Sequence, residues 1–211
     1  VLGTSELVVG GVMVVGVLAI GQTFVILTAG IDLSCGTVMA FGQIVMTKLA
    51  VAEGVDPLLA IALGIAACVC FGLLNGVFVA GVGLPAFIVT LGTLNIAFAL
   101  THVYSNDETY SDLPSELLFF GRFFTIGNAE ITYGVPAMFV LFGIAWYALT
   151  QTTWGRHVFA VGDNLEAARL MGIKTKRVLL SVYVVAGLTY GIAAMLLVAR
   201  TELGDPNAGQ T

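Results

Sequence analysis

Long apolar runs, broken by short polar or glycine-containing segments, dominate the pattern of this 211-residue chain. No Asp, Glu, Lys or Arg occurs in residues 7–31 or in residues 57–106. About 20 consecutive apolar residues are enough for a helix to cross the hydrocarbon core of a bilayer. The pattern therefore predicts an all-α fold, a polytopic bundle of transmembrane helices that forms one domain over residues 1–211.

Six spans are predicted from the apolar runs and the residues that interrupt them. Pro57 suits the first turn of a helix, and Gly83-Leu84-Pro85 separates the third span from the fourth. The spans cover about residues 7–27, 36–52, 58–82, 86–104, 131–149 and 178–199. The chain begins within apolar sequence and without Met, so we expect a fragment of a longer protein and no signal peptide.

The basic residues predict the orientation of the spans. Residues 151–177 hold five of the eight basic residues, namely Arg156, Arg169, Lys174, Lys176 and Arg177. Loops rich in Lys and Arg stay in the cytoplasm. Residues 105–130 carry five carboxylates and one arginine, so we expect this loop on the outside. One span separates the two loops, and the two assignments therefore agree.

Composition excludes several classes of protein. The chain is 58% hydrophobic and 10% charged, against about 25% charged for a typical soluble domain. Soluble helices need polar outer faces, and too few charges are present to supply them. The sequence has neither the basic stripe nor the high pI that is typical of nucleic-acid-binding proteins. The three cysteines all lie in apolar sequence, where small packing residues are expected.

Enzymatic sequence motifs are missing. The chain has no G-x-x-x-x-G-K-[ST] segment with which to bind ATP. Its two histidines, His102 and His157, lack the spacing of metal ligands. We therefore predict a protein that is not an enzyme and that holds neither a cofactor nor a metal.

Asp32 is the one carboxylate between Glu6 and Glu53, in the segment TAGIDLSCG. A charge inside a bilayer is costly and usually functional. Gly30 and Ser34 beside it indicate a break between two helices, where Asp32 or Ser34 caps the next helix. A direct place in the substrate path is the alternative interpretation.

Uncharged polar residues are scattered through the predicted spans. As a set they suit a neutral, hydroxyl-rich solute better than an ion, which calls for charges or rings of carbonyls. Hydrogen bonds between helices are the alternative explanation for each of them. They are Gln22, Gln43, Asn75, Thr90, Thr93 and Asn95. The candidates for the helix break or the substrate path are Asp32, Ser34, Asn75, Thr90 and Thr93.

Residues 162–173 predict a short helix in the basic loop. Asp163 or Asn164 suits its N-cap, and Glu166 follows Asp163 at the spacing of a capping box. Gly172 suits its C-terminal stop. The helix would have about eight residues, too few to be stable in isolation. Its apolar edge of Leu165, Ala168 and Met171 therefore needs a surface, either a partner protein or the lipid headgroups.

Two further segments predict local packing. Small residues recur at every fourth position in the third span, which lets another helix approach closely. They are Gly64, Cys68, Gly72, Gly76 and Ala80. In the outer loop, LLFFGRFF (117–124) predicts either a segment lying flat in the interface or a short buried hairpin.

The chain resembles a known family in several places. Glu166-Ala167-Ala168, followed after three residues by Gly172, is similar to the Glu-Ala-Ala loop of ATP-binding-cassette (ABC) importer permeases. Other segments resemble the ribose/xylose-type sugar permeases of that class. They are ILTAGIDLSCGTVMA (26–40), GLLNGVFVA (72–80), PAFIVTLGTL (85–94), TTWGRHVFAVGDNLEAARLMGI (152–173) and VYVVAGLTYGIAAMLLVAR (182–200). The family has one more span before residue 7 and further spans after residue 211.

The resemblance implies a permease subunit that imports a monosaccharide across the plasma (bacterial inner) membrane. It implies a second permease copy, a cytoplasmic ATPase and a periplasmic or lipid-anchored sugar-binding protein as partners, with membrane lipid around the spans. The implied ATPase-coupling loop comprises Gly155, Arg156, Gly162, Asn164, Glu166, Ala167, Ala168, Arg169, Gly172 and Ile173. ABC permeases for nucleosides, autoinducers or branched-chain amino acids are alternatives, and an ion-coupled secondary transporter is the rival of another class.

Overall fold

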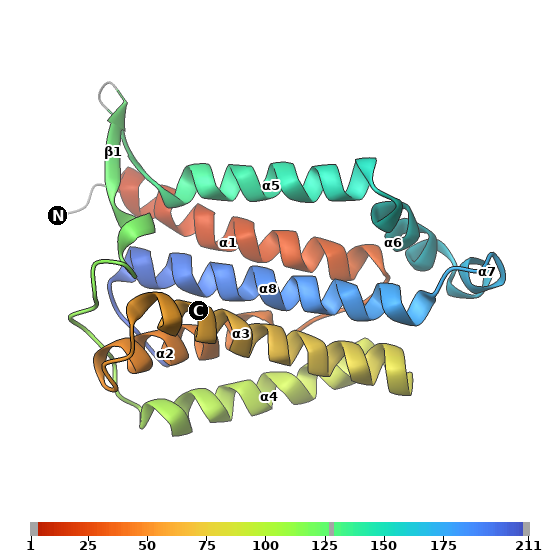
Figure 1. Ribbon diagram of the computed structural model, residues 1–211, viewed down its shortest axis with the longest axis horizontal. Coiled ribbons are helices and arrows are strands. Elements are labelled where there is room, and N and C mark those ends of the chain that lie inside the picture. The colour runs from red at the N-terminus through yellow and green to blue at the C-terminus, as the bar shows by residue number, and fades with distance from the viewer. Residues whose placement is uncertain (1–3, 127–128, 209–211) are drawn as a thin grey trace.

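The computed structural model describes residues 4–126 and 129–208, with side chains for residues 11–125 and 131–208. The side chain of Glu130, one of the five outer carboxylates, lies outside this description. Six helices form an elongated bundle (Figure 1). They are α1 (Thr4–Leu27), α2 (Cys35–Val51), α3 (Pro57–Gly76), α4 (Ala86–Ser105), α5 (Gly134–Gln151) and α8 (Thr175–Thr201).

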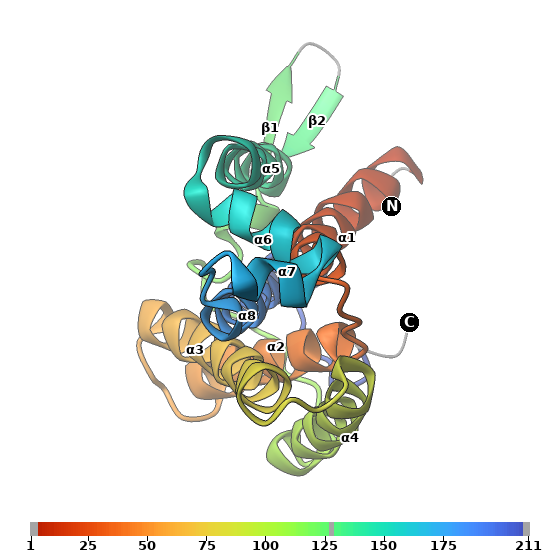
Figure 2. The same cartoon turned by 90° about the vertical axis from the view of Figure 1, so that its right-hand side faces the viewer.

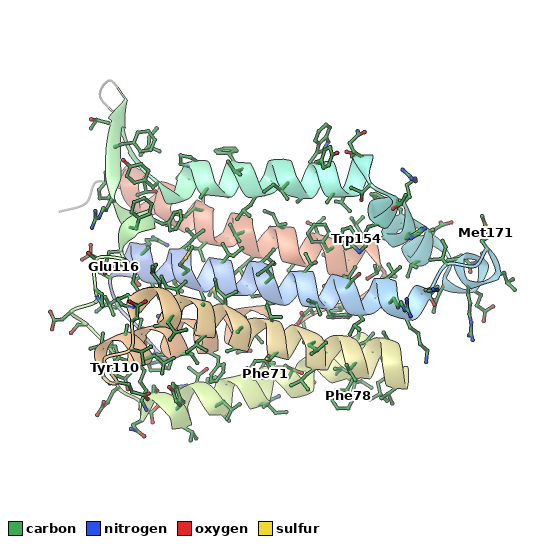
Figure 3. The ribbon with its side chains drawn as sticks, in the orientation of Figure 1. Phe71, Phe78, Tyr110, Glu116, Trp154 and Met171 are labelled. Carbon is green, nitrogen blue, oxygen red and sulfur yellow. The ribbon has the colours of Figure 1, made fainter. Side chains whose placement is uncertain are left out.

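Two shorter helices, α6 (Thr153–Asp163) and α7 (Leu165–Leu170), lie at one end of the bundle, as Figures 1 and 2 show. A 3-10 turn, η2 (Phe119–Gly121), and a hairpin of β1 (Phe123–Ile126) and β2 (Ala129–Thr132) lie at the other. The basic and the acidic loops therefore occupy opposite ends. Figure 3 marks them with Met171 at one end and Tyr110 and Glu116 at the other.

Among the described residues, four helical segments are long and apolar enough to cross a membrane. They are Pro57–Val82, Ala86–Ser105, Gly134–Gln151 and Thr175–Thr201. The described part of α1, Gly11–Leu27, and α2 are shorter apolar helices. The predicted class, an all-α membrane bundle, is confirmed.

Helix α8 forms the centre of the bundle, between α1 on one side and α2 and α3 on the other. Small residues make this close packing possible. A Cβ atom at Gly72 of α3 would lie 2.3 Å from the Tyr183 carbonyl oxygen, and one at Gly187 of α8 would lie 2.6 Å from that of Cys68. The predicted seam of small residues in the third span therefore packs against two helices: Gly72 and Gly76 lie against α8, whereas Gly64 and the Cys68 side chain lie against α2.

Helix α3 does not end as an α-helix. A π-helix, η1 (Val77–Val82), continues it to Gly83, whose φ of 86° is left-handed. Pro85 then precedes α4. The break that Gly83-Leu84-Pro85 predicted is present, and Lys176 of α8 donates a hydrogen bond to the Gly81 carbonyl oxygen at 3.1 Å. The wide turns of η1 thus lie beside the start of α8.

The outer end contains more regular structure than the sequence indicated. Residues 131 and 132 belong to β2, so α5 starts three residues later than the predicted fifth span. In the segment LLFFGRFF, Leu117 is buried, whereas Phe119 and Phe123 are about half exposed. Neither a fully flat nor a fully buried segment describes it. Nearby, burial raises the pKa of Tyr110, whose phenol donates to the Ser105 carbonyl oxygen at 3.2 Å.

Candidate coupling surface and a buried polar chain

The basic loop folds into two helices, where we had predicted one. Thr152 caps α6 by accepting the Gly155 N–H at 3.1 Å. A Cβ atom at Gly155 would lie 2.2 Å from the Leu149 carbonyl oxygen, and one at Gly162 would lie 1.9 Å from that of Leu27. Both ends of α6 therefore lie against the ends of membrane helices, α5 and α1, where a larger side chain does not fit.

Helix α7 is held by its ends. The Asn164 side chain accepts the Ala167 N–H at 2.9 Å and caps the helix. Asp163 is the last residue of α6, so of the two predicted caps Asn164 is correct, and the capping box between Asp163 and Glu166 is wrong. Glu166 still lies in the first turn, where a carboxylate favours the helix dipole. Gly172, the predicted C-terminal stop, has a φ of 83°, so the chain leaves α7 in the left-handed conformation.

The faces of α7 differ from the prediction. Ala168 is 4% exposed and belongs to a core cluster with Val161 and Val178, so it does not form an outer docking edge. The exposed apolar side chains are Leu165 (48%), Leu170 (89%) and Met171 (83%). Leu170 was not among the predicted residues. Met171 points away from the bundle in Figure 3.

The other predicted loop residues surround this surface. Arg156 on α6 and Ala167 and Arg169 on α7 are exposed. Ile173 is half-buried, and its N–H donates to the Ala168 carbonyl oxygen at 3.1 Å. The loop thus presents apolar and basic side chains beyond the end of the bundle.

A buried polar chain starts in the non-helical segment between α1 and α2. Asp32 is 5% exposed. One of its carboxylate oxygens accepts the Ser34 N–H at 2.8 Å and the Ser34 hydroxyl at 2.6 Å. The other accepts the Tyr190 hydroxyl at 3.1 Å. Gln22 of α1 donates to the Asp32 carbonyl oxygen at 2.8 Å. These contacts fasten the break to α1 and α8.

The buried network of hydrogen bonds continues into α3 and α4. The Asn75 amide donates to the Ser34 hydroxyl oxygen at 3.2 Å, and the Thr93 hydroxyl donates to the Asn75 side-chain oxygen at 2.5 Å. The Thr90 hydroxyl donates to the Ile31 carbonyl oxygen at 3.1 Å. All five residues predicted for the helix break or the substrate path therefore meet at one place, and all are buried.

The break is not held by the predicted cap. Ser34 occupies the N-cap position of α2, but its side chain makes no capping hydrogen bond. Asp32 accepts the N–H of Ser34 itself, which is the local turn that Asp side chains favour. Each of these five side chains has a hydrogen-bond partner, so in this conformation the network joins the helices. The buried Tyr183 hydroxyl, which lies beside Gly30 in the same break, has no partner in the described part of the protein.

Two partners in these sites carried no local signal in the sequence. Tyr190 is 158 positions from Asp32. Trp154 donates from its indole nitrogen to the Ser181 hydroxyl oxygen at 2.8 Å and so ties α6 to α8. Only the packing of α8 at the centre of the bundle brings either pair together.

Comparison with known proteins places the chain in a family. Residues 6–211 match the family described as "Branched-chain amino acid transport system / permease component". The chain belongs to this family. It is 42% identical over 212 residues to the fructose import permease protein FrcC of Rhizobium meliloti, covering 98% of this chain and 59% of that protein.

Other members of the family carry related names. The ribose import permease protein RbsC of Bacillus subtilis is 37% identical over 200 residues, which cover 93% of this chain and 60% of RbsC. The L-arabinose ABC transporter permease protein AraH of Azospirillum brasilense is 34% identical over 198 residues, or 92% and 56% of the two chains. The chain therefore spans about 60% of the length of these curated relatives. No solved structure matches it.

Family membership and the apolar helices agree on the setting. The chain is a multi-pass protein of the inner membrane. The relatives named above are transport permeases. The buried polar chain accordingly lies among membrane-spanning helices, and the α6–α7 surface lies at one end of them.

Proposed function

We propose that this chain is most of the permease subunit of an ABC importer that moves a monosaccharide into the cell. The exposed apolar surface of α7 carries the proposal. Leu170 and Met171 project at the end of the bundle. A membrane permease needs an exposed docking surface of this kind if a separate subunit supplies its energy. The relatives named for fructose, ribose and L-arabinose support a monosaccharide as the solute.

The proposed partner at α7 is a cytoplasmic ATPase, to which ATP hydrolysis belongs. Leu170 and Met171 would enter an apolar groove on the ATPase, while Arg156 and Arg169 would pair with its carboxylates. A sugar-binding protein would dock at the acidic loop 105–130, and a second permease copy would complete the pathway. Force applied to α7 reaches the bundle because Ala168 and Gly162 pack directly against it.

The proposed role of Asp32, Ser34, Asn75, Thr90 and Thr93 is to hold the helix break in place. Buried polar networks whose members are all paired fix one arrangement of the helices around them. Because the break, α1, α3, α4 and α8 all meet there, a movement of α8 relative to α3 and α4 has to rearrange these bonds. This network of hydrogen bonds is therefore the joint through which the break and the four helices move together.

Reconstitution tests the proposed function. The full-length permease, its ATPase and its binding protein are placed in liposomes, and ATP-dependent uptake of labelled fructose, ribose and L-arabinose is measured. Saturable uptake of at least one of them, dependent on ATP and on the binding protein, is the expected result. Leucine, isoleucine, valine, nucleosides and autoinducers serve as competitors, and their transport in place of sugar would favour the other permeases of this class.

An ion-coupled secondary transporter is the rival mechanism. Such a protein needs ionisable groups along its spans. Asp32, in the break between the first two predicted spans, is the one carboxylate at this depth, and the spans themselves hold only two basic side chains, Lys48 and His102, each near an end. Uptake that continues after a protonophore and a sodium ionophore have collapsed the gradients, with ATP still present, is expected. Uptake that stops with the gradient would reject the ABC mechanism.

A further inference from the structure

A basic pocket of about 500 Å³ lies between α6, the turn after α7 and the first turns of α8. His157, Lys174 and Arg177 line it together with Trp154 and Ser181, and none of its lining residues is a carboxylate. Within the described part of the chain, these three basic side chains have no ion-pair partner. Lys174 and Arg177 therefore give the pocket a positive charge, at the end of the bundle that the basic loop 151–177 predicts to be cytoplasmic.

An apolar groove of about 400 Å³ lies on the membrane side of this pocket, between α5 and α8 with α1 as its floor. Its lining is almost wholly aliphatic and aromatic, and the one hydroxyl, that of Thr189, is bonded to the Ala186 carbonyl oxygen. Ile144 (59% exposed) and Leu188 (42% exposed) lie along it. The groove therefore opens sideways, toward the place of the lipid.

The two cavities meet at Trp154, which lines both. Its indole is fixed by the hydrogen bond to Ser181 and by an edge contact with Phe24 at a centroid distance of 5.4 Å. Lys174 is the N-cap residue of α8, and the pocket residues Arg177, Val178 and Ser181 of α8 are followed by the groove residues Val185, Leu188 and Ile192. From Lys174 through Val178 and Ser181 to Ile192 these positions are three or four apart, so they form one face of the helix.

Beside Trp154 of α6, the lining of the two cavities changes from basic to apolar. This order of side chains fits a molecule with an anionic head and a hydrocarbon tail. Trp concentrates at the boundary between headgroups and hydrocarbon, and basic pockets between helices on the cytoplasmic side bind anionic lipid headgroups. We propose that the two cavities together bind one anionic glycerophospholipid. Its phosphate contacts Lys174 and Arg177, and one acyl chain lies in the groove along Leu188.

Charge and continuity favour a lipid over a protein occupant. An acidic side chain of an ATPase would satisfy the basic pocket but would leave the apolar groove unfilled. Another helix of the protein would fill the groove but would leave the charges of Lys174 and Arg177 beside Trp154 unpaired. A phospholipid joins an anion to a hydrocarbon chain in one molecule and fits both cavities.

Quenching of Trp154 by brominated lipid tests the proposal. Full-length permease is placed in phosphatidylcholine vesicles with dibrominated phosphatidylglycerol or, at the same mole fraction, dibrominated phosphatidylcholine. The chain has two tryptophans, so the Trp154 signal is the difference between the Trp146→Phe and Trp146→Phe/Trp154→Phe proteins. Stronger quenching by phosphatidylglycerol is expected, and equal quenching by both lipids would overturn the proposal.

Charge and groove variants sharpen the test. Each basic side chain near an anionic lipid contributes about fivefold to affinity, so Lys174→Gln/Arg177→Gln should lower the preference for phosphatidylglycerol roughly 25-fold. Arg156 is an exposed basic residue outside the pocket, so Arg156→Gln is the matched control and should leave the preference for phosphatidylglycerol unchanged.

A photo-crosslinker at Leu188 tests the groove and should attach to lipid. Attachment to the ATPase, a second copy or the rest of the chain would show that a protein covers the groove.

Discussion

Asp32 is a buried carboxylate whose partners are neutral. In the described part of the chain no basic side chain lies within 4 Å of it, and its three hydrogen bonds come from Ser34 and Tyr190. Leaving buried donors unpaired costs about 1–3 kcal/mol per group. The hydrogen bonds therefore make Asp32 a structural element of the break, because they fix its two sides to α8.

An amide at position 32 should retain this role. In Asp32→Asn, the amide oxygen still accepts both bonds from Ser34, and the Tyr190 hydroxyl turns to accept from the amide nitrogen. Asp32→Leu leaves these donors unpaired and should lower membrane expression and thermal stability by several degrees. We expect Asn to keep most of the transport rate, measured as uptake per permease in the membrane. Loss of uptake in a normally expressed Asn protein would mean that the negative charge itself is required.

The sequence predicts the existence of this joint but not its partners. A lone carboxylate beside glycine in an apolar run indicates a break, and polar residues inside spans indicate hydrogen bonds. That Asn75 bonds to Ser34 while Tyr190 bonds to Asp32 depends on how α3 and α8 are rotated. Rotation is set by the small-residue seam between those helices, and a single sequence does not encode it in any local pattern.

Helix α7 is the element whose stability depends most on its ends. Its six residues are too few to form a stable helix alone. The Asn164 cap, the burial of Ala168 and the left-handed Gly172 compensate for this. The result is a projecting helix whose exposed side chains are partly apolar, Leu165 and Leu170, and partly charged, Glu166 and Arg169.

A charge at position 170 should disrupt the proposed ATPase contact. Leu170 is 89% exposed, so Leu170→Glu costs the permease little stability but places a carboxylate in an apolar contact. We expect at least about tenfold weaker ATPase retention, a loss of roughly 1.4 kcal/mol, and a matching fall in uptake. Leu170→Met is the control. Unchanged retention of the ATPase by the Glu variant would place the docking surface elsewhere.

Position 172 tests whether the exit of α7 matters. Gly172→Val forces a β-branched side chain into the left-handed region, which such residues tolerate poorly. Asn enters that region more readily than other residues, so Gly172→Asn should keep more function. We expect the Val protein to insert normally and to show lower uptake and lower ATPase retention than the Asn protein. Equal effects of the two substitutions would argue against backbone strain as the cause.

At this scale the sequence was partly informative. The glycine stop of α7 was predictable because Gly is the common residue at a left-handed helix exit. The cap was ambiguous because Asp163 and Asn164 both suit it, and the choice follows from α6 continuing through Asp163. Helix α6 was missed, since its amphipathic run follows a membrane span directly and its glycines, which normally weaken a helix, serve here to contact α5 and α1.

The whole molecule is organised around α8. In its apolar 18-residue stretch 67% of the residues are buried, against 11% in the corresponding stretch of α5. The hydropathy pattern predicted the class of fold and the order of the helices, because charge-free runs of that length have no stable place in a soluble protein. It did not predict which helix is central, since all the runs are apolar. Both a helix buried inside the bundle and a helix that faces lipid are rich in apolar residues. Small residues are the one sequence signal that distinguishes the buried helix.

The orientation of the molecule gives the last prediction. The acidic and basic loops lie at opposite ends of the bundle, so loop 105–130 should face outward if loop 151–177 faces the cytoplasm. After replacement of the native cysteines, Glu108→Cys should react with a membrane-impermeant thiol reagent in intact cells. Arg156→Cys should react only after the membrane is opened. Both positions are exposed, so burial does not explain a difference between them, and the reverse result would invert the topology and move the proposed ATPase contact to the wrong side of the membrane.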